Sequence, residues 1–299
     1  MLPLSNLRCR LLVQGKGKTI LFLGEQHSYH YHRKKHKIPL SEIIVDYLQQ
    51  ADHVDFLFET DVRKTDVLAL DMNSDEMAEY QEQIRVPKNI TGNAILNQVR
   101  RLLAPYIKPY NDDDGAAKQF PAARVHWIDL DFNAGHKKSH PFLDALSDLT
   151  FRLNLENYEP FFQRIEACIM KESELTEADF LEAFRWEHST KSNFEHRLSL
   201  QKRIFLVSLN ILMGEDKVFY KCDHYTSVFM ERAAEFDYSQ YSFYSALHRF
   251  FMDVYTCCRI LKTDAVETWY KNIIVYSGLL HTITCAKLLR LEGFSVYKI

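Results

Sequence analysis

One short apolar run constrains this chain more than any other stretch. Residues 19–23 are apolar or β-branched without interruption, and Gly24-Glu25-Gln26-His27 follows them directly. A run of this kind that ends at a glycine predicts a strand buried on both faces. The polar residues then fall at the carboxyl end of the strand, where open parallel sheets bind ligands. The stretch therefore predicts either a site that binds a metal or moves a proton, or a strand end whose polar residues cap a loop.

The composition favours a helix-rich protein with a large aromatic core. Of the 299 residues 46% are hydrophobic, and the chain has 20 Phe and 16 Tyr but only 9 Gly. The net charge of −3 indicates no general attraction to nucleic acid. We expect a soluble, cytoplasmic protein: residues 1–15 do not look like a secretory signal, and no apolar run approaches the roughly 20 residues of a membrane helix. The six scattered cysteines, with no CxxC pair, are typical of a reducing compartment.

Strand and helix patterns alternate along the chain. Strands are predicted at residues 7–13, 19–23, 54–58, 125–128, 272–276 and 294–299, and helices follow at 41–50 and at 281–291. Helical periodicity also recurs at 156–171, 177–187, 194–213 and 242–261. This order predicts a single α/β domain over residues 1–299, with a mainly parallel central sheet flanked by helices. Residues 142–262 are predicted to form a large helical insertion before the last βαβ unit. We expect it to roof a cleft at the carboxyl ends of the strands, because a parallel sheet needs cover on both faces.

Four of the predicted strands end in polar side chains. Glu25 and His27 follow the strand predicted at residues 19–23. The strands predicted at 54–58, 125–128 and 272–276 are followed by Glu59, Asp129 and His281, respectively. Because the carboxyl ends of parallel strands meet at one edge of a sheet, we expect these side chains to surround one cleft.

The same residues resemble a known superfamily. The first motif is Gly24-Glu25-Gln26-His27 after a hydrophobic strand, the second is Phe58-Glu59-Thr60 at the end of the next strand, and the third is Gly278-Leu279-Leu280-His281 before a helix. All three are similar to motifs of the superfamily that unites erythromycin esterase, the haem-binding protein ChaN and the TraB/TIKI proteases. The resemblance covers residues 7–60 and 270–299, with Asp129 between them, and not the helical middle. It implies an α/β fold and an active cleft lined by His27, Glu59 and His281, with Glu25 beside them.

The resemblance implies a hydrolase that acts on an ester or amide bond of a small molecule or peptide. In its metal-dependent members, residues like His27, Glu59 and His281 bind a divalent cation such as Mn²⁺, Co²⁺ or Zn²⁺ that activates water. Glu25 or Asp129 would then take the proton of the water. Two alternatives remain open: a metal-free pair acting as general base, and a non-catalytic binding or structural module, which could hold haem on an exposed His or Tyr.

Three further patterns resemble functional motifs but are given other interpretations. His30, His32 and His36 lie in a basic stretch, residues 29–37, which predicts a solvated loop able to contact an anionic substrate or partner. Asp129-Leu130-Asp131 resembles the metal-binding DxD of nucleotide-sugar transferases, but no other signature of those enzymes accompanies it. Cys222-Asp223-His224 is interpreted as a structural loop, although it contains a nucleophile and a base.

Overall fold

The computed structural model describes residues 7–25, 40–59, 103, 120, 122–128, 141–151, 158–185, 191–213, 222–234, 239–261 and 271–299. The chain divides into two compact units, one made of residues 1–130 and 255–299 and the other of residues 131–254. The predicted single domain with an insertion at 142–262 stays a prediction. None of the helices within the described ranges is long and apolar enough to cross a membrane.

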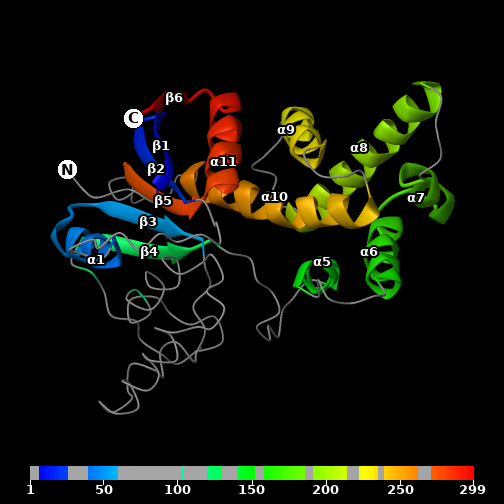
Figure 1. Cartoon of the computed structure of the whole chain (residues 1–299), viewed down its shortest axis with the longest axis horizontal. Coiled ribbons are helices and arrows are strands. Elements are labelled where there is room, and N and C mark those ends of the chain that lie inside the picture. The colour runs from blue at the N-terminus through cyan, green and yellow to red at the C-terminus, as the bar shows by residue number, and fades with distance from the viewer. Residues whose placement is uncertain are drawn as a thin grey trace, which may run out of the picture. The chain divides into compact units, whose positions relative to one another are not determined.

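The first unit contains a six-stranded mixed sheet (Figure 1). Its strands are β1 (Leu7–Gly15), β2 (Lys18–Glu25), β3 (Val54–Phe58), β4 (Ala123–Trp127), β5 (Asn272–Gly278) and β6 (Ser295–Lys298). Their order across the sheet is β4-β3-β5-β2-β1-β6. Strands β4, β3, β5 and β2 pair in parallel, whereas β1 runs antiparallel to both β2 and β6. The α/β class and the mainly parallel sheet predicted from the sequence are confirmed.

The hairpin between β1 and β2 is closed by a two-residue turn. Lys16 and Gly17 both have positive φ, at 48° and 74°, and Gly15 is in register with Lys18. Two successive residues with positive φ are the signature of a type I′ turn, whose twist matches that of the flanking strands. The turn places β2 beside β1 and leaves the other edge of β2 to pair with β5.

Helices cover both faces of the sheet. Side chains of α1 (Leu40–Gln50) form one apolar cluster with Phe56 and Phe58 of β3 and Tyr276 of β5. On the opposite face α11 (Leu279–Leu291) contacts β1, β2 and β5. A Cβ added to Gly24 would meet the side chain of Thr282 at 3.0 Å, so glycine at this position allows α11 to approach β2 closely.

Helix α11 ends in a glycine cap. Gly293 has φ of +88°, its N–H donates to the carbonyl of Arg290, and the N–H of Phe294 donates to the carbonyl of Leu289. These two bonds make a Schellman motif, which satisfies carbonyls that the helix leaves open. The predicted cap at Gly293 is confirmed, and the chain turns there into β6.

The second unit is helical. It contains α5 (Pro141–Phe151), α6 (Glu159–Lys171), α7 (Glu177–Ala183), α8 (Lys191–Met213), α9 (Cys222–Ala234) and most of α10 (Gln240–Leu261). Its core is aromatic: the rings of Phe205 and Phe229 stack at 4.3 Å, and Phe229 meets Phe243 edge to face at 5.2 Å. Such contacts stabilise beyond the area that they bury.

One sequence interpretation in this unit was wrong. Cys222-Asp223-His224 is the first turn of α9 and not a loop. The helix forms because Tyr225 and Phe229, four residues apart, are both fully buried on one face. Burial in the helical core therefore decides the conformation of a polar stretch whose own residues favour turns.

Candidate functional site at the carboxyl edge of the sheet

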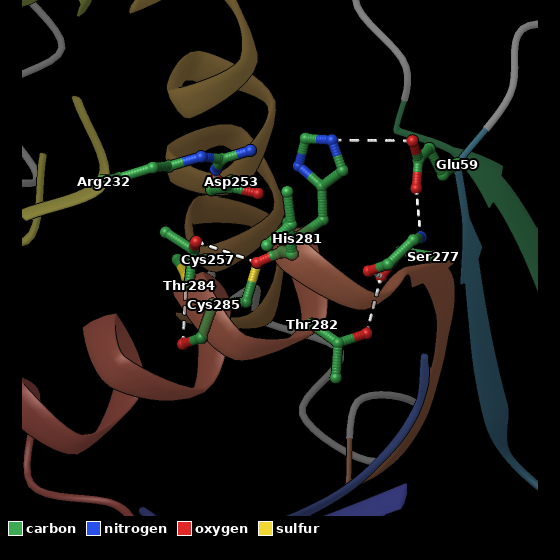
Figure 2. Close-up of polar contacts among 11 residues, drawn as sticks. Glu59, Arg232, Asp253, Cys257, Ser277, His281, Thr282, Thr284 and Cys285 are labelled. Atoms are coloured by element: carbon green, nitrogen blue, oxygen red, sulfur yellow. Dashed lines mark hydrogen bonds and ion pairs between the residues drawn. The ribbon is translucent and has the colours of Figure 1, made fainter. Parts of the chain in front are cut away.

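Glu59 and His281 come together where β3 and β5 end. The backbone N–H of Glu59 donates to the carbonyl of Tyr276 at 2.9 Å, which extends the pairing of the two strands by one residue. The Glu59 carboxylate accepts a hydrogen bond from the N–H of Gly278 through Oε2. Its other oxygen, Oε1, lies 3.5 Å from Nε2 of His281 (Figure 2). The Glu59 carboxylate thus contacts Gly278 and His281, which lie at least 219 positions later in the chain.

Helix α11 positions the histidine. Gly278 is both the last residue of β5 and the N-cap of α11, so His281 lies in the first helical turn. The hydroxyls of Ser277 and Thr282 bond to each other at 3.0 Å and tie the strand end to the helix (Figure 2). The positive end of the helix dipole also favours the Glu59 carboxylate. The strand-to-helix transition thus holds both partners of the Glu59–His281 contact.

Glu25 is a buried carboxylate at the end of the neighbouring strand β2. Only 3% of it is exposed, and the hydroxyl of Tyr276 donates a hydrogen bond to its Oε2. Burial, helped by the charge of Glu59, raises the pKa of Glu25 from 4.5 to about 7 against the opposing effect of the Tyr276 hydrogen bond. A carboxyl group that titrates near neutral pH can accept or donate a proton under physiological conditions.

The donor atoms of Glu59 and His281 are spaced as two ligands of one ion would be. With bonds of 2.0–2.2 Å, two ligands of a tetrahedral zinc ion lie about 3.4 Å apart. The Oε1 and Nε2 atoms are 3.5 Å apart. A catalytic zinc site commonly has three protein ligands, and no group of three His, Cys, Asp or Glu able to hold a metal occurs among the described residues. The pair fits a metal, and a third ligand would have to come from elsewhere in the chain.

Two predicted site residues, His27 and Asp129, lie outside the described residues. Their strands nevertheless end at this edge, because β2 and β4 are parallel to β5 and β3. The histidines at 30, 32 and 36 and Asp131 are likewise outside the described ranges. Of the predicted set, the structure therefore brings together Glu59 and His281, with Glu25 on the adjoining strand.

A second polar network on β3 and β4 was not anticipated. Arg124 binds both carboxylate oxygens of Asp55, each at 2.8 Å, and Nε2 of His126 lies 3.7 Å from Oδ1 of the same carboxylate. The guanidinium of Arg259 lies 2.9 Å from Nδ1 of His126. Arginine can only donate, so this contact requires an unprotonated Nδ1. Titratable residues at alternate positions of a strand, Arg124 and His126, were the available sequence signal.

Burial and neighbouring charges together shift the pKa values of Asp55 and His126. Burial alone would raise the pKa of Asp55, but the nearby His126 imidazole and the two hydrogen bonds from Arg124 outweigh it and hold the pKa below its ordinary value. The pKa of His126 is lowered, first by burial and then by the charge of Arg259, against the pull of Asp55. Asp55 is therefore ionised and His126 neutral near pH 7, which is the pattern of a structural ion pair.

Comparisons with protein-family models, curated proteins and solved structures gave no match. The similarity to the erythromycin esterase, ChaN and TraB/TIKI superfamily therefore remains a resemblance of motifs.

Proposed function

We propose that this chain is a hydrolase that cleaves an ester or amide bond with the help of a divalent metal ion at the carboxyl edge of the sheet. One observation carries the proposal: a carboxylate oxygen of Glu59 and the Nε2 of His281 meet at 3.5 Å, at the strand ends where parallel sheets bind ligands. The resemblance of motifs supports the same chemistry.

Glu59 and His281 are the proposed ligands that the structure describes, and His27 is the proposed third. A bound Zn²⁺, Mn²⁺ or Co²⁺ would lower the pKa of water and polarise the scissile carbonyl. The N–H of Gly278 holds one oxygen of Glu59, so the carboxylate presents the other oxygen towards His281. This hydrogen bond fixes the orientation of the proposed ligand in the way that outer partners commonly do in metal sites.

Glu25 is the proposed proton carrier. Its pKa of about 7 allows the side chain to take a proton from water and return it to a leaving group. Tyr276, which is fully buried, fixes the position of the carboxylate through its hydroxyl. Asp129 is the second candidate for this role.

The test combines metal analysis with thermal melting of the purified full chain. Wild type should carry a divalent metal or show a higher Tm with Mn²⁺, Co²⁺ or Zn²⁺, because a ligand that binds only the native state stabilises it. His281→Ala should abolish the shift and reduce metal affinity at least about tenfold. His196→Ala is the matched control, because His196 is exposed on α8 and should leave the shift unchanged.

The same contact also supports a metal-free alternative. Glu59 could orient the His281 imidazole, which would then act as general base on water. A metal-independent esterase whose activity falls in both Glu59→Gln and His281→Ala would support this alternative and overturn the metal-dependent proposal. Absence of both metal binding and turnover of model esters and peptides would leave the non-catalytic module.

A further inference from the structure

A cavity of about 620 Å³ lies on the α1 face of the sheet. Its floor is formed by β1, β2, β3 and β5, and α1 contributes Ile43, Ile44 and Tyr47 to one wall. None of Glu25, Glu59 and His281 lines it. Its volume is within the range of about 300–1,000 Å³ that is usual for small-molecule sites.

The lining is almost entirely apolar. Leu21 and Leu23 of β2 and Ile274 of β5 point to this side of the sheet, because alternate residues of a strand share a face. Between Thr19 and Leu23 the strand covers about 13 Å, which sets the length of the apolar floor. An elongated hydrocarbon fits such a surface better than a compact polar molecule does.

One charged side chain interrupts the apolar surface. Among the lining residues that the structure describes, Arg10 is the single charged side chain, and it is exposed on β1. Its strand register places it opposite Leu23, at the end of the floor nearest the carboxyl edge. A ligand whose apolar chain lies along β2 would therefore present its head group to a guanidinium, which pairs well with a carboxylate.

We propose that this cavity binds a fatty carboxylate, with the hydrocarbon chain on the floor formed by β2 and β5 and the head group at Arg10. Apolar lining selects the chain and the charge of Arg10 selects the acid over a neutral amphiphile. The proposal does not depend on the hydrolase: the cavity and the Glu59–His281 contact share no lining residue.

The test measures binding of octanoate, decanoate and dodecanoate to the full chain by calorimetry. Each added methylene should tighten binding about three- to fourfold while the cavity has room. Dodecanoate should bind more tightly than dodecanol, and Arg10→Gln should weaken the acid about two- to fivefold without affecting the alcohol. Arg290→Gln is the matched control, because Arg290 is exposed on α11 and does not line the cavity.

A blocking variant tests the location. Thr19 is an exposed lining residue on a strand, where an aromatic side chain is readily accepted, so Thr19→Trp should fold and weaken dodecanoate binding at least about tenfold. Circular dichroism checks the fold of the variant, and Glu59→Gln should bind dodecanoate as wild type does, which separates this proposal from the hydrolase. Binding that is absent in wild type, insensitive to chain length or unchanged by Thr19→Trp would overturn the proposal. A dimer of wild type that Thr19→Trp disrupts, without fatty-acid binding, would assign the cavity to a second copy and also overturn it.

Discussion

Two buried carboxylates of the same sheet differ in their surroundings. Glu25 at the carboxyl edge and Asp55 in the middle of β3 are each only 3% exposed. Asp55 pairs with a guanidinium, and its pKa lies below the ordinary value. Glu25 accepts a bond from the neutral hydroxyl of Tyr276, and its pKa is raised to about 7. Equal burial thus gives opposite protonation behaviour, because the partner and not the depth decides the balance.

The difference separates a carboxylate that is buried with an opposite charge from one that is buried beside a second acid. A buried carboxylate with an arginine stays charged and holds two strands together, and the helical unit repeats the arrangement in the buried pair Arg232–Asp253 of α9 and α10 (Figure 2). A buried carboxylate beside a second acid, as Glu25 is beside Glu59, is held at a cost to stability. Sites that tolerate such a cost are frequently those that perform chemistry.

The largest effect on the free energy of unfolding should come from breaking the Asp55–Arg124 pair in the middle of the sheet. Arg124→Met leaves the buried Asp55 without its bidentate partner and should cost about 3 kcal/mol of unfolding free energy. We place the loss at the low end of the range for buried pairs because the Arg124 side chain is 33% exposed. Urea denaturation at pH 7 measures it.

The matched control for that variant is an exposed pair. Arg164 and Asp148 contact each other at 2.7 Å, but the arginine is 49% exposed, so Arg164→Met should cost less than about 1 kcal/mol. If Arg124→Met and Arg164→Met lost the same unfolding free energy, the Asp55–Arg124 pair would be no more important to stability than an exposed pair.

An intermediate effect, with a dependence on pH, should come from Glu25→Gln. Glu25 has a pKa of about 7 when folded against an ordinary value of 4.5, so the folded protein binds the extra proton between these values. Stability therefore falls as pH rises from about 4.5 to 7, and charged Glu25 opposes folding above pH 7. Glu25→Gln should raise the unfolding free energy by about 2 kcal/mol at pH 8 and change it little at pH 4.

The stability contributed by Asp55 depends on pH in the opposite direction, which Asp55→Asn tests. The folded pKa of Asp55 is lowered from 3.8, so its ionised form contributes stability above that pH and loses it in more acidic solution. Asp55→Asn should be destabilising at pH 7, with a cost that shrinks as the pH falls below about 4. Parallel pH profiles for Glu25→Gln and Asp55→Asn would contradict the comparison.

The smallest effect should come from a neutral pair at the carboxyl edge. Ser277→Ala removes the hydroxyl that bonds to Thr282, and both residues are buried, so the expected loss is about 1 kcal/mol at any pH between 5 and 8. Ser208→Ala is the control: its buried hydroxyl bonds only to a carbonyl of its own helix, and alanine favours helix. A chemical denaturation series would show a clear loss only for Ser277→Ala, and a loss that varied with pH would be inconsistent with a neutral contact.

Local patterns in the sequence were sufficient for most of the described elements and for part of the site. Continuous apolar runs predicted β2, β3 and β5, and a glycine predicted the end of α11. The meeting of Glu59 with His281 followed from one rule, that carboxyl ends of parallel strands share an edge. The proposed chemistry of these residues is a separate matter that the fold does not decide.

Strand order lay beyond local patterns. No short-range signal places β5 between β2 and β3, so the bond from Tyr276 to Glu25, 251 residues away, was not foreseen. The pairing of Asp55 with Arg124 depends in the same way on β3 lying beside β4. Each contact depends on which strands become neighbours, and packing of the whole sheet determines that.

The central position of β5 has a consequence for synthesis of the chain. Strands β2 and β3 flank β5 and do not pair with each other, and residues 59–271 are translated after β3 before β5 begins. At about 5–20 residues per second, this interval lasts roughly 10–40 s. During that time β2 and β3 each have an open strand edge available for pairing with another chain. The nascent protein should therefore be most prone to aggregation, and most dependent on chaperones, just before β5 leaves the ribosome.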